Sequence, residues 1–137
     1  MSVETSTQLR ATTLFCDDLR LEIGGKLSAM GIYQGIMALP ADEILLPKLV
    51  AWTAIELPKA WSGGRVQVRL LDRDQLLTEA QFDTSDLPPD GQHIVLNVPL
   101  TAMPFSAKVG MVLHVTISAP GLNHRSGDLR IVAQDAA

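Results

Sequence analysis

Apolar and polar residues alternate along much of this chain, and this alternation constrains the fold more than any other feature of the sequence. Val66, Val68 and Leu70 are separated by single polar residues. The same spacing recurs over residues 93–98 and 111–118. A period of two places successive side chains on opposite faces of a β-strand. Each segment is therefore predicted to be a strand with one buried face and one face toward solvent.

Turn residues interrupt the alternation and divide the chain into about eight predicted strands. The strands are expected over residues 10–19, 27–36, 48–57, 65–70, 75–82, 93–98, 111–118 and 129–133. Gly24-Gly25, Asp72–Gln75 and Ala119–Gly121 have the composition of tight turns. Residues 41–46 and 101–107 are candidates for helices of no more than about two turns. The pattern predicts an all-β fold, a two-sheet antiparallel β-sandwich of the immunoglobulin-like or C2-like kind.

Length and charge argue against several classes of protein. The 137 residues are expected to form one domain over residues 9–137, preceded by a polar, flexible tail at residues 1–8. The net charge of −4 lacks the surplus of lysine and arginine that nucleic-acid binding requires, so no nucleic-acid partner is expected. No apolar run approaches the roughly 18 residues of a membrane-spanning helix. We therefore expect a cytoplasmic protein, or a virion component if the chain is phage-encoded.

Two acidic pairs are the candidates for a metal site. Asp17 and Asp18 lie near the end of the first predicted strand, and Asp72 and Asp74 lie in a predicted hairpin turn. Calcium binds about six to eight oxygen ligands, which aspartates at one end of a sandwich could supply. The alternative is structural, because aspartate stabilises tight turns and Arg20 could neutralise the first pair.

The sequence contains no recognisable catalytic motif, so no catalytic residue is assigned and no cofactor is expected. Cys16 is the single cysteine, which rules out an intrachain disulfide. Two aspartates follow it and would raise its pKa, so it is predicted to be a small buried residue rather than a nucleophile. His93, His114 and His124 lack the close spacing of zinc ligands, and we expect them to face solvent.

The candidates for partner binding are an aromatic residue in a loop and a row of arginines. Trp61 lies in a loop rich in proline and glycine, where an indole either folds onto the core or contacts a partner. Trp52 falls within a predicted strand and is expected in the core. Arg65, Arg69 and Arg73 share one strand face and its turn, and they could contact an acidic partner. The alternative is a solvated polar face without a partner.

Several short motifs resemble a family of small bacterial and phage β-sandwich proteins known as a domain of unknown function. The most specific motifs are Phe15-Cys16-Asp17-Asp18, Gly25-Lys26-Leu27 and Gly31-Ile32-Tyr33. Weaker similarity continues through Leu46-Pro47-Lys48-Leu49, residues 65–74 and Gly127-Asp128-Leu129. The resemblance implies an all-β sandwich from a prokaryote or a phage, and it supplies no catalytic residues.

These observations favour a non-enzymatic protein-interaction or structural module. If phage-encoded, it would be a virion or assembly component or would bind a host protein. Its partner would be another protein or a second copy of itself, and no membrane partner is expected. Two alternatives remain open: a calcium- or small-ligand-binding β-sandwich, and an enzyme whose site is assembled from separated residues.

Overall fold

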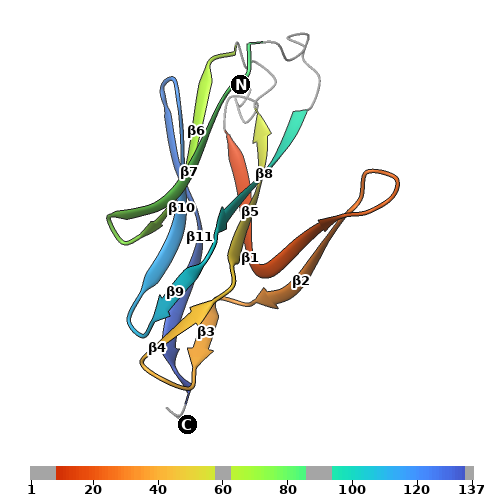
Figure 1. Ribbon diagram of the computed structural model, residues 1–137. Helices are drawn as coiled ribbons and strands as arrows, with labels where there is room; N and C mark the ends of the chain where they lie inside the picture. Colours follow the sequence, from red (N-terminus) through yellow and green to blue (C-terminus); the bar gives the residue numbers. More distant parts are fainter. Residues whose placement is uncertain (1–8, 58–62, 86–93, 135–137) are drawn as a thin grey trace, which may run out of the picture.

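The computed structural model describes residues 9–57, 63–85 and 94–134 and shows an all-β chain (Figure 1). No α-helix occurs in these ranges. Eleven strands follow one another: β1 (Arg10–Leu21), β2 (Leu27–Tyr33), β3 (Ile36–Leu39), β4 (Glu43–Leu46), β5 (Leu49–Leu57), β6 (Arg65–Asp72), β7 (Gln75–Asp83), β8 (Ile94–Ala102), β9 (Phe105–Lys108), β10 (Val112–Ala119) and β11 (Leu122–Ala133). The predicted all-β class is confirmed, with eleven strands in place of about eight. The predicted tail at residues 1–8 lies outside the described residues.

The strands form three sheets. A four-stranded sheet has the order β2-β1-β5-β8, a five-stranded sheet has the order β3-β11-β10-β6-β7, and β4 pairs with β9. Among the described residues, every pair is antiparallel except β3 and β11, which are parallel. The expected two antiparallel sheets are therefore corrected to three sheets with one parallel pair. Buried side chains from all three sheets join one hydrophobic cluster, so the core lies where the sheets meet.

The short helices expected over residues 41–46 and 101–107 are wrong, because both segments contain strands. Strands β4 and β9 pair with each other in an antiparallel ladder. Each has four residues, and prolines lie close to both, so neither segment could complete the turns that stabilise a helix. The backbone N–H and C=O groups of these two segments instead form hydrogen bonds between β4 and β9, which are distant in the sequence.

Two other predicted boundaries differ from the structure. The strand expected over residues 27–36 divides into β2 and β3, because the chain passes from the four-stranded to the five-stranded sheet at Gln34 and Gly35. Gly35 has a φ of 88°, which glycine adopts readily. Strand β11 begins at Leu122, well before the predicted residue 129, because a bulge interrupts its alternation.

The predicted buried faces of the central strands are confirmed. Val68 in β6 and Leu113 and Val115 in β10 are all 0% exposed. In the antiparallel β6–β10 pair, Val68 lies opposite Ile117 and Val115 lies opposite Leu70. Neighbouring strands thus present apolar residues to the same face, which is the arrangement that the alternation requires.

The bulge in β11 brings the two larger sheets into close contact. Gly127 has no Cα partner in β10, and its φ is 73°. A Cβ atom at this position would lie 2.7 Å from the Cβ of Thr13 in β1. In the same region the Thr13 hydroxyl donates to Ser126 Oγ at 2.8 Å and lies 2.9 Å from Thr53 Oγ1. Glycine is therefore needed for this close approach, and the buried hydroxyls satisfy one another.

The ends of β1 and β2 that meet at the Gly24-Gly25 turn project from the rest of the molecule as a hairpin. We call residues 17–33 the arm; it extends to the right in Figure 1. Pairing between β1 and β5 ends at Cys16 and Val50, and the described pairing of β1 beyond this point is with β2. Gly31 lies against Asp17 here with a φ of 67°, and a Cβ atom would be 2.2 Å from Asp17 Oδ2. The glycine therefore allows the two strands to approach closely at the root of the arm.

Candidate functional site

A polar cluster occupies the root of the arm. The Tyr33 hydroxyl in β2 donates to Asp17 Oδ1 in β1 at 2.5 Å. The neighbouring carboxylate of Asp18 binds Lys48 Nζ at 2.5 Å and Arg20 Nε at 3.1 Å. Pairing of Asp18 with Arg20 was the structural alternative to a metal site, and the structure shows this pair. The contact with Lys48 joins the arm to the segment between β4 and β5.

The electrostatics of this cluster leave its possible nucleophiles protonated. Burial raises the pKa of the Tyr33 hydroxyl, and the hydrogen bond to the Asp17 carboxylate raises it further. Burial also raises the pKa of the Cys16 thiol, which is 0% exposed as predicted. Hydrogen bonds from lysine and arginine lower the pKa of Asp18 and keep it ionised. At neutral pH the cluster therefore presents neither a thiolate nor a phenolate.

A surface depression of about 430 Å³ opens beside this cluster. Its lining residues come from β1, β2 and the end of β4 with the segment that follows it: Asp17, Asp18, Tyr33, Leu46, Pro47 and Lys48. Asp18 and Lys48 in the lining pair with each other, whereas the Asp17 carboxylate is bonded to the uncharged Tyr33 hydroxyl, so the lining keeps one carboxylate without a cationic partner among its own residues.

The structure does not bring together the four aspartates of the calcium hypothesis. Asp17 and Asp18 lie in the four-stranded sheet, whereas Asp72 and Asp74 lie at the β6–β7 turn of the five-stranded sheet. The Asp72 carboxylate accepts a hydrogen bond from the backbone N–H of Val112 at 3.0 Å, a structural role at the turn. Among the described residues, no group of three or more histidine, cysteine or acidic side chains could hold a metal ion. The calcium hypothesis has no geometric support in these ranges.

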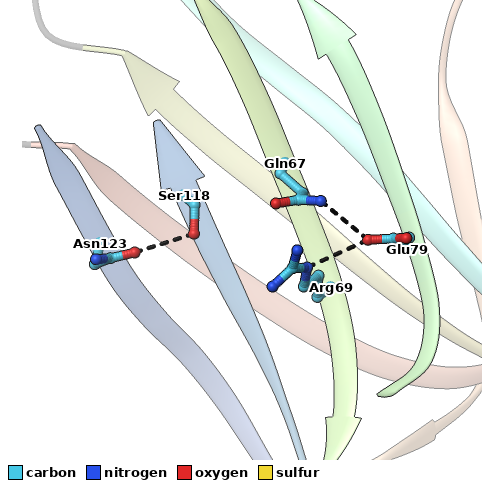
Figure 2. A network of polar contacts seen from close by, with 5 residues as sticks. All are labelled: Gln67, Arg69, Glu79, Ser118 and Asn123. Atoms are coloured by element: carbon cyan, nitrogen blue, oxygen red, sulfur yellow. Dashed lines mark hydrogen bonds and ion pairs between the residues drawn. The ribbon is translucent and has the colours of Figure 1, made fainter. Parts of the chain in front are cut away.

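The outer face of the five-stranded sheet is polar, and its side chains bind one another. Figure 2 shows Gln67 Nε2 and Arg69 Nε both donating to Glu79 Oε1, at 3.1 and 3.2 Å. On the neighbouring strands, Ser118 Oγ donates to Asn123 Oδ1 at 3.0 Å. Arg69, predicted as a partner-binding residue, is thus engaged within its own sheet. This arrangement matches the alternative of a solvated polar face.

The other predicted partner-binding residues lie in different settings. Arg65 is exposed at the start of β6. Arg73 lies in the β6–β7 turn with a φ of 54°, and its guanidinium donates to the carbonyl of Gly110 at 2.8 Å. Trp61 lies outside the described residues. Arg65 and Arg69 therefore share the outward face of β6, whereas Arg73 is bonded within the turn, and binding of a partner by these arginines stays a prediction.

One predicted histidine environment is wrong. His114 is only 7% exposed, whereas we expected it to face solvent. It lies on the central strand β10, between β6 and β11, whose side chains shield it. Its Nδ1 atom is buried and has no hydrogen-bond partner, and burial lowers its pKa. His124 is partly buried, and His93 lies outside the described residues.

An apolar strip crosses the outer face of the four-stranded sheet, among polar and charged residues on the same face. Leu14, Trp52 and Pro99 lie side by side across β1, β5 and β8. The prediction that Trp52 belongs to the core is wrong, because its neighbours Ala51 and Thr53 are the fully buried residues. The Trp52 indole N–H donates to an asparagine of β8 at 3.0 Å, and the side chain is half-buried. The sequence of β5 did not show which of its two faces is buried, because the residues on both faces are largely apolar.

The arm exposes apolar side chains away from the sheets, beside several charged ones. Ile23 at its tip is 96% exposed, and Leu21 is 77% exposed. Met30 and Ile32 in β2 are 45% and 49% exposed. We did not single out these four residues from the sequence, because an apolar residue in an alternating strand is expected to be buried. Their exposure became apparent only from the projection of the arm.

Comparison with protein-family models and with curated protein sequences finds no match for this chain. Within the described ranges, no helix is long and apolar enough to cross a membrane.

Proposed function

We propose that this protein is a non-enzymatic interaction or structural module whose contact surface is the arm together with the outer face of the four-stranded sheet. The observation that supports this most strongly is the exposure of Leu21, Ile23, Met30 and Ile32 on one projecting hairpin. Exposed apolar side chains grouped on one element are typical of protein-interaction sites. A projecting hairpin also reaches a partner without distorting the core that supports it.

The polar cluster at the root of the arm supports the same assignment. The ion pair of Asp18 with Lys48 ties the arm to the segment before β5, and the hydrogen bond from Tyr33 to Asp17 holds the two strands of the arm together. Such ties hold a contact surface in place and reduce the entropy lost on binding. The pKa directions of Tyr33 and Cys16 favour a structural role over nucleophilic catalysis.

We propose that the fold is a β-sandwich in the broad sense, in which the two larger sheets enclose the core and the β4–β9 pair covers one part of it. One hydrophobic cluster shared by the sheets supports this. The resemblance to bacterial and phage proteins supports a virion or assembly component, or a host-protein binder, in the cytoplasm or the virion.

The test compares two leucines with similar exposure on different elements. Leu21 on the arm is 77% exposed, and Leu45 on β4 is 68% exposed. The full chain, Leu21→Ser and Leu45→Ser are immobilised, and bound proteins from a bacterial extract are quantified by mass spectrometry. We expect Leu21→Ser to reduce capture of a specific partner by about tenfold or more, as for a central interface residue.

Leu45→Ser is the control, because it removes the same side chain from a surface outside the arm. Equal capture by all three proteins would refute the assignment of the arm as the contact surface. If the wild-type chain neither captured a partner nor associated with itself, the proposed function itself would fall. Thermal melts of the two variants should be similar to that of the wild type, because both side chains are exposed.

A further inference from the structure

Four strands lie at the edges of the two larger sheets, and three of them carry features that discourage pairing with another chain. The edges are β2 and β8 in one sheet and β3 and β7 in the other. An edge strand has unpaired backbone N–H and C=O groups, which proteins protect with charges, proline or short length. Strand β8 contains Pro99, β7 contains Glu79, and β3 has four residues followed by Pro40.

Strand β2 lacks these protective features. Its seven residues, Leu27–Tyr33, include no charged residue and no proline. It lies on the arm, whose far end stands apart from the two larger sheets in Figure 1. The described residues place β1 on one side of β2 and no strand on the other. The positive φ of Gly31 is the single irregularity in the strand, and it lies at the root of the arm.

We propose that β2 pairs antiparallel with the β2 strand of a second copy of this chain. This inference deepens the proposed function by naming the partner of the arm, and it rests on that function. Pairing centred on Met30 places Leu27 opposite Tyr33 and Ser28 opposite Ile32. No like charges oppose each other in this register, because β2 has none.

The exposed apolar residues of β2 favour a second copy as the occupant. Met30 and Ile32 are two residues apart and so share one face of the strand. About a twofold axis at Met30, the same residues of both copies form one continuous apolar strip. Strand β7 offers no such match, because pairing it with itself about Glu79 would place two carboxylates together.

The pairing produces a closed and symmetric assembly. The two four-stranded sheets join into one continuous sheet of eight strands, four from each copy. A twofold interface uses the same surface on both subunits, so no edge is left to recruit a third copy through β2. The outer faces of the two four-stranded sheets, each with its apolar strip of Leu14, Trp52 and Pro99, then lie on one larger surface.

The first test measures molar mass by light scattering over a range of concentrations, using the full chain. Met30→Lys places a charge on the pairing strand, and Val95→Lys is its matched control on the edge strand β8. The two side chains are 45% and 44% exposed. We expect the wild type and Val95→Lys to have twice the monomer mass and Met30→Lys to have the monomer mass. A monomeric wild type, or a Met30→Lys variant that remains dimeric, would overturn the inference.

The second test reports the register and does not depend on how Met30→Lys folds. Directly opposed residues in antiparallel strands have Cα atoms about 4.5–5.5 Å apart, within the roughly 4.4–6.8 Å that a disulfide spans. Met30→Cys should therefore form an intermolecular disulfide on mild oxidation, whereas Val95→Cys should not. The buried native Cys16 is common to both. Equal crosslinking by the two variants would refute the register.

The outcome separates this inference from the proposed function. A monomeric wild type that still loses a captured partner through Leu21→Ser would leave the interaction module intact and remove self-pairing. A dimer that persists in Met30→Lys would place self-association on another surface.

Discussion

Replacement of Gly127 by alanine tests whether the β11 bulge controls the approach of the two larger sheets. Gly127 has a φ of 73°, and a Cβ atom there would lie 2.7 Å from Thr13 Cβ and 3.2 Å from Phe15 Cε2. Both contacts involve β1, on the opposite sheet. The added methyl group cannot be accommodated unless β1 and β11 separate, which would also strain the Thr13–Ser126 hydrogen bond of 2.8 Å.

Two costs contribute to the expected destabilisation. The left-handed conformation costs an alanine about 1–2 kcal/mol. Overpacking of a close contact costs about 1–3 kcal/mol more. Gly127→Ala should therefore lower the free energy of unfolding by about 2–5 kcal/mol, a large share of the stability of a domain of this size.

Gly121 supplies the control, because its φ is 74° and nothing lies within 4 Å of its Cβ position. Gly121→Ala therefore carries the conformational cost alone, about 1–2 kcal/mol. The difference between the two variants isolates the contact between the sheets. Urea denaturation of both variants and the wild type gives this difference directly. Equal losses of stability would show that the sheets adjust freely and would refute the argument.

Three further substitutions should affect stability to different extents. Leu113→Ala should lower the free energy of unfolding by about 2–4 kcal/mol in urea denaturation, since the side chain is 0% exposed; a loss below about 1 kcal/mol would place it outside the core. Burial lowers the pKa of His114 in the folded state, so the unfolded chain binds the proton more tightly, and stability should fall as the pH drops below about 6.5. His114→Gln should weaken this decline in denaturation curves at about pH 5 and pH 7.5, and an unchanged decline would assign it to other groups. Arg69→Ala should cost less than about 1 kcal/mol, because the pair with Glu79 is exposed to solvent; a larger loss in thermal melts would show that the network of Figure 2 supports the sheet.

The alternation of apolar and polar residues along the chain was sufficient to identify the core strands. The alternation around Val68 and Val115 identified the faces that the structure buries completely. The turn at Pro120-Gly121 was also predictable, because proline and glycine favour the backbone angles of tight turns. These features are local, since the spacing of side chains along a strand determines which of them share a face.

The candidate site could be predicted only in part. Asp17 and Asp18 were singled out from the sequence, and they do lie in the polar cluster at the root of the arm. Lys48, the partner of Asp18, is distant in the sequence, so this hydrogen-bonded cluster could not be distinguished from a metal site. The exposure of Ile23 could not be predicted either, because it depends on how far the arm projects from the sheets.

The sequence by itself determined that the chain is all-β, where several strands lie and which of their faces are buried, because these properties follow from residue spacing and turn chemistry. Tertiary structure decided the rest. It made strands of the segments at residues 41–46 and 101–107 by pairing them, and it placed Trp52 on an outer face. It also separated the two aspartate pairs onto different sheets. Each outcome depends on contacts between residues far apart in the chain, which no local pattern encodes.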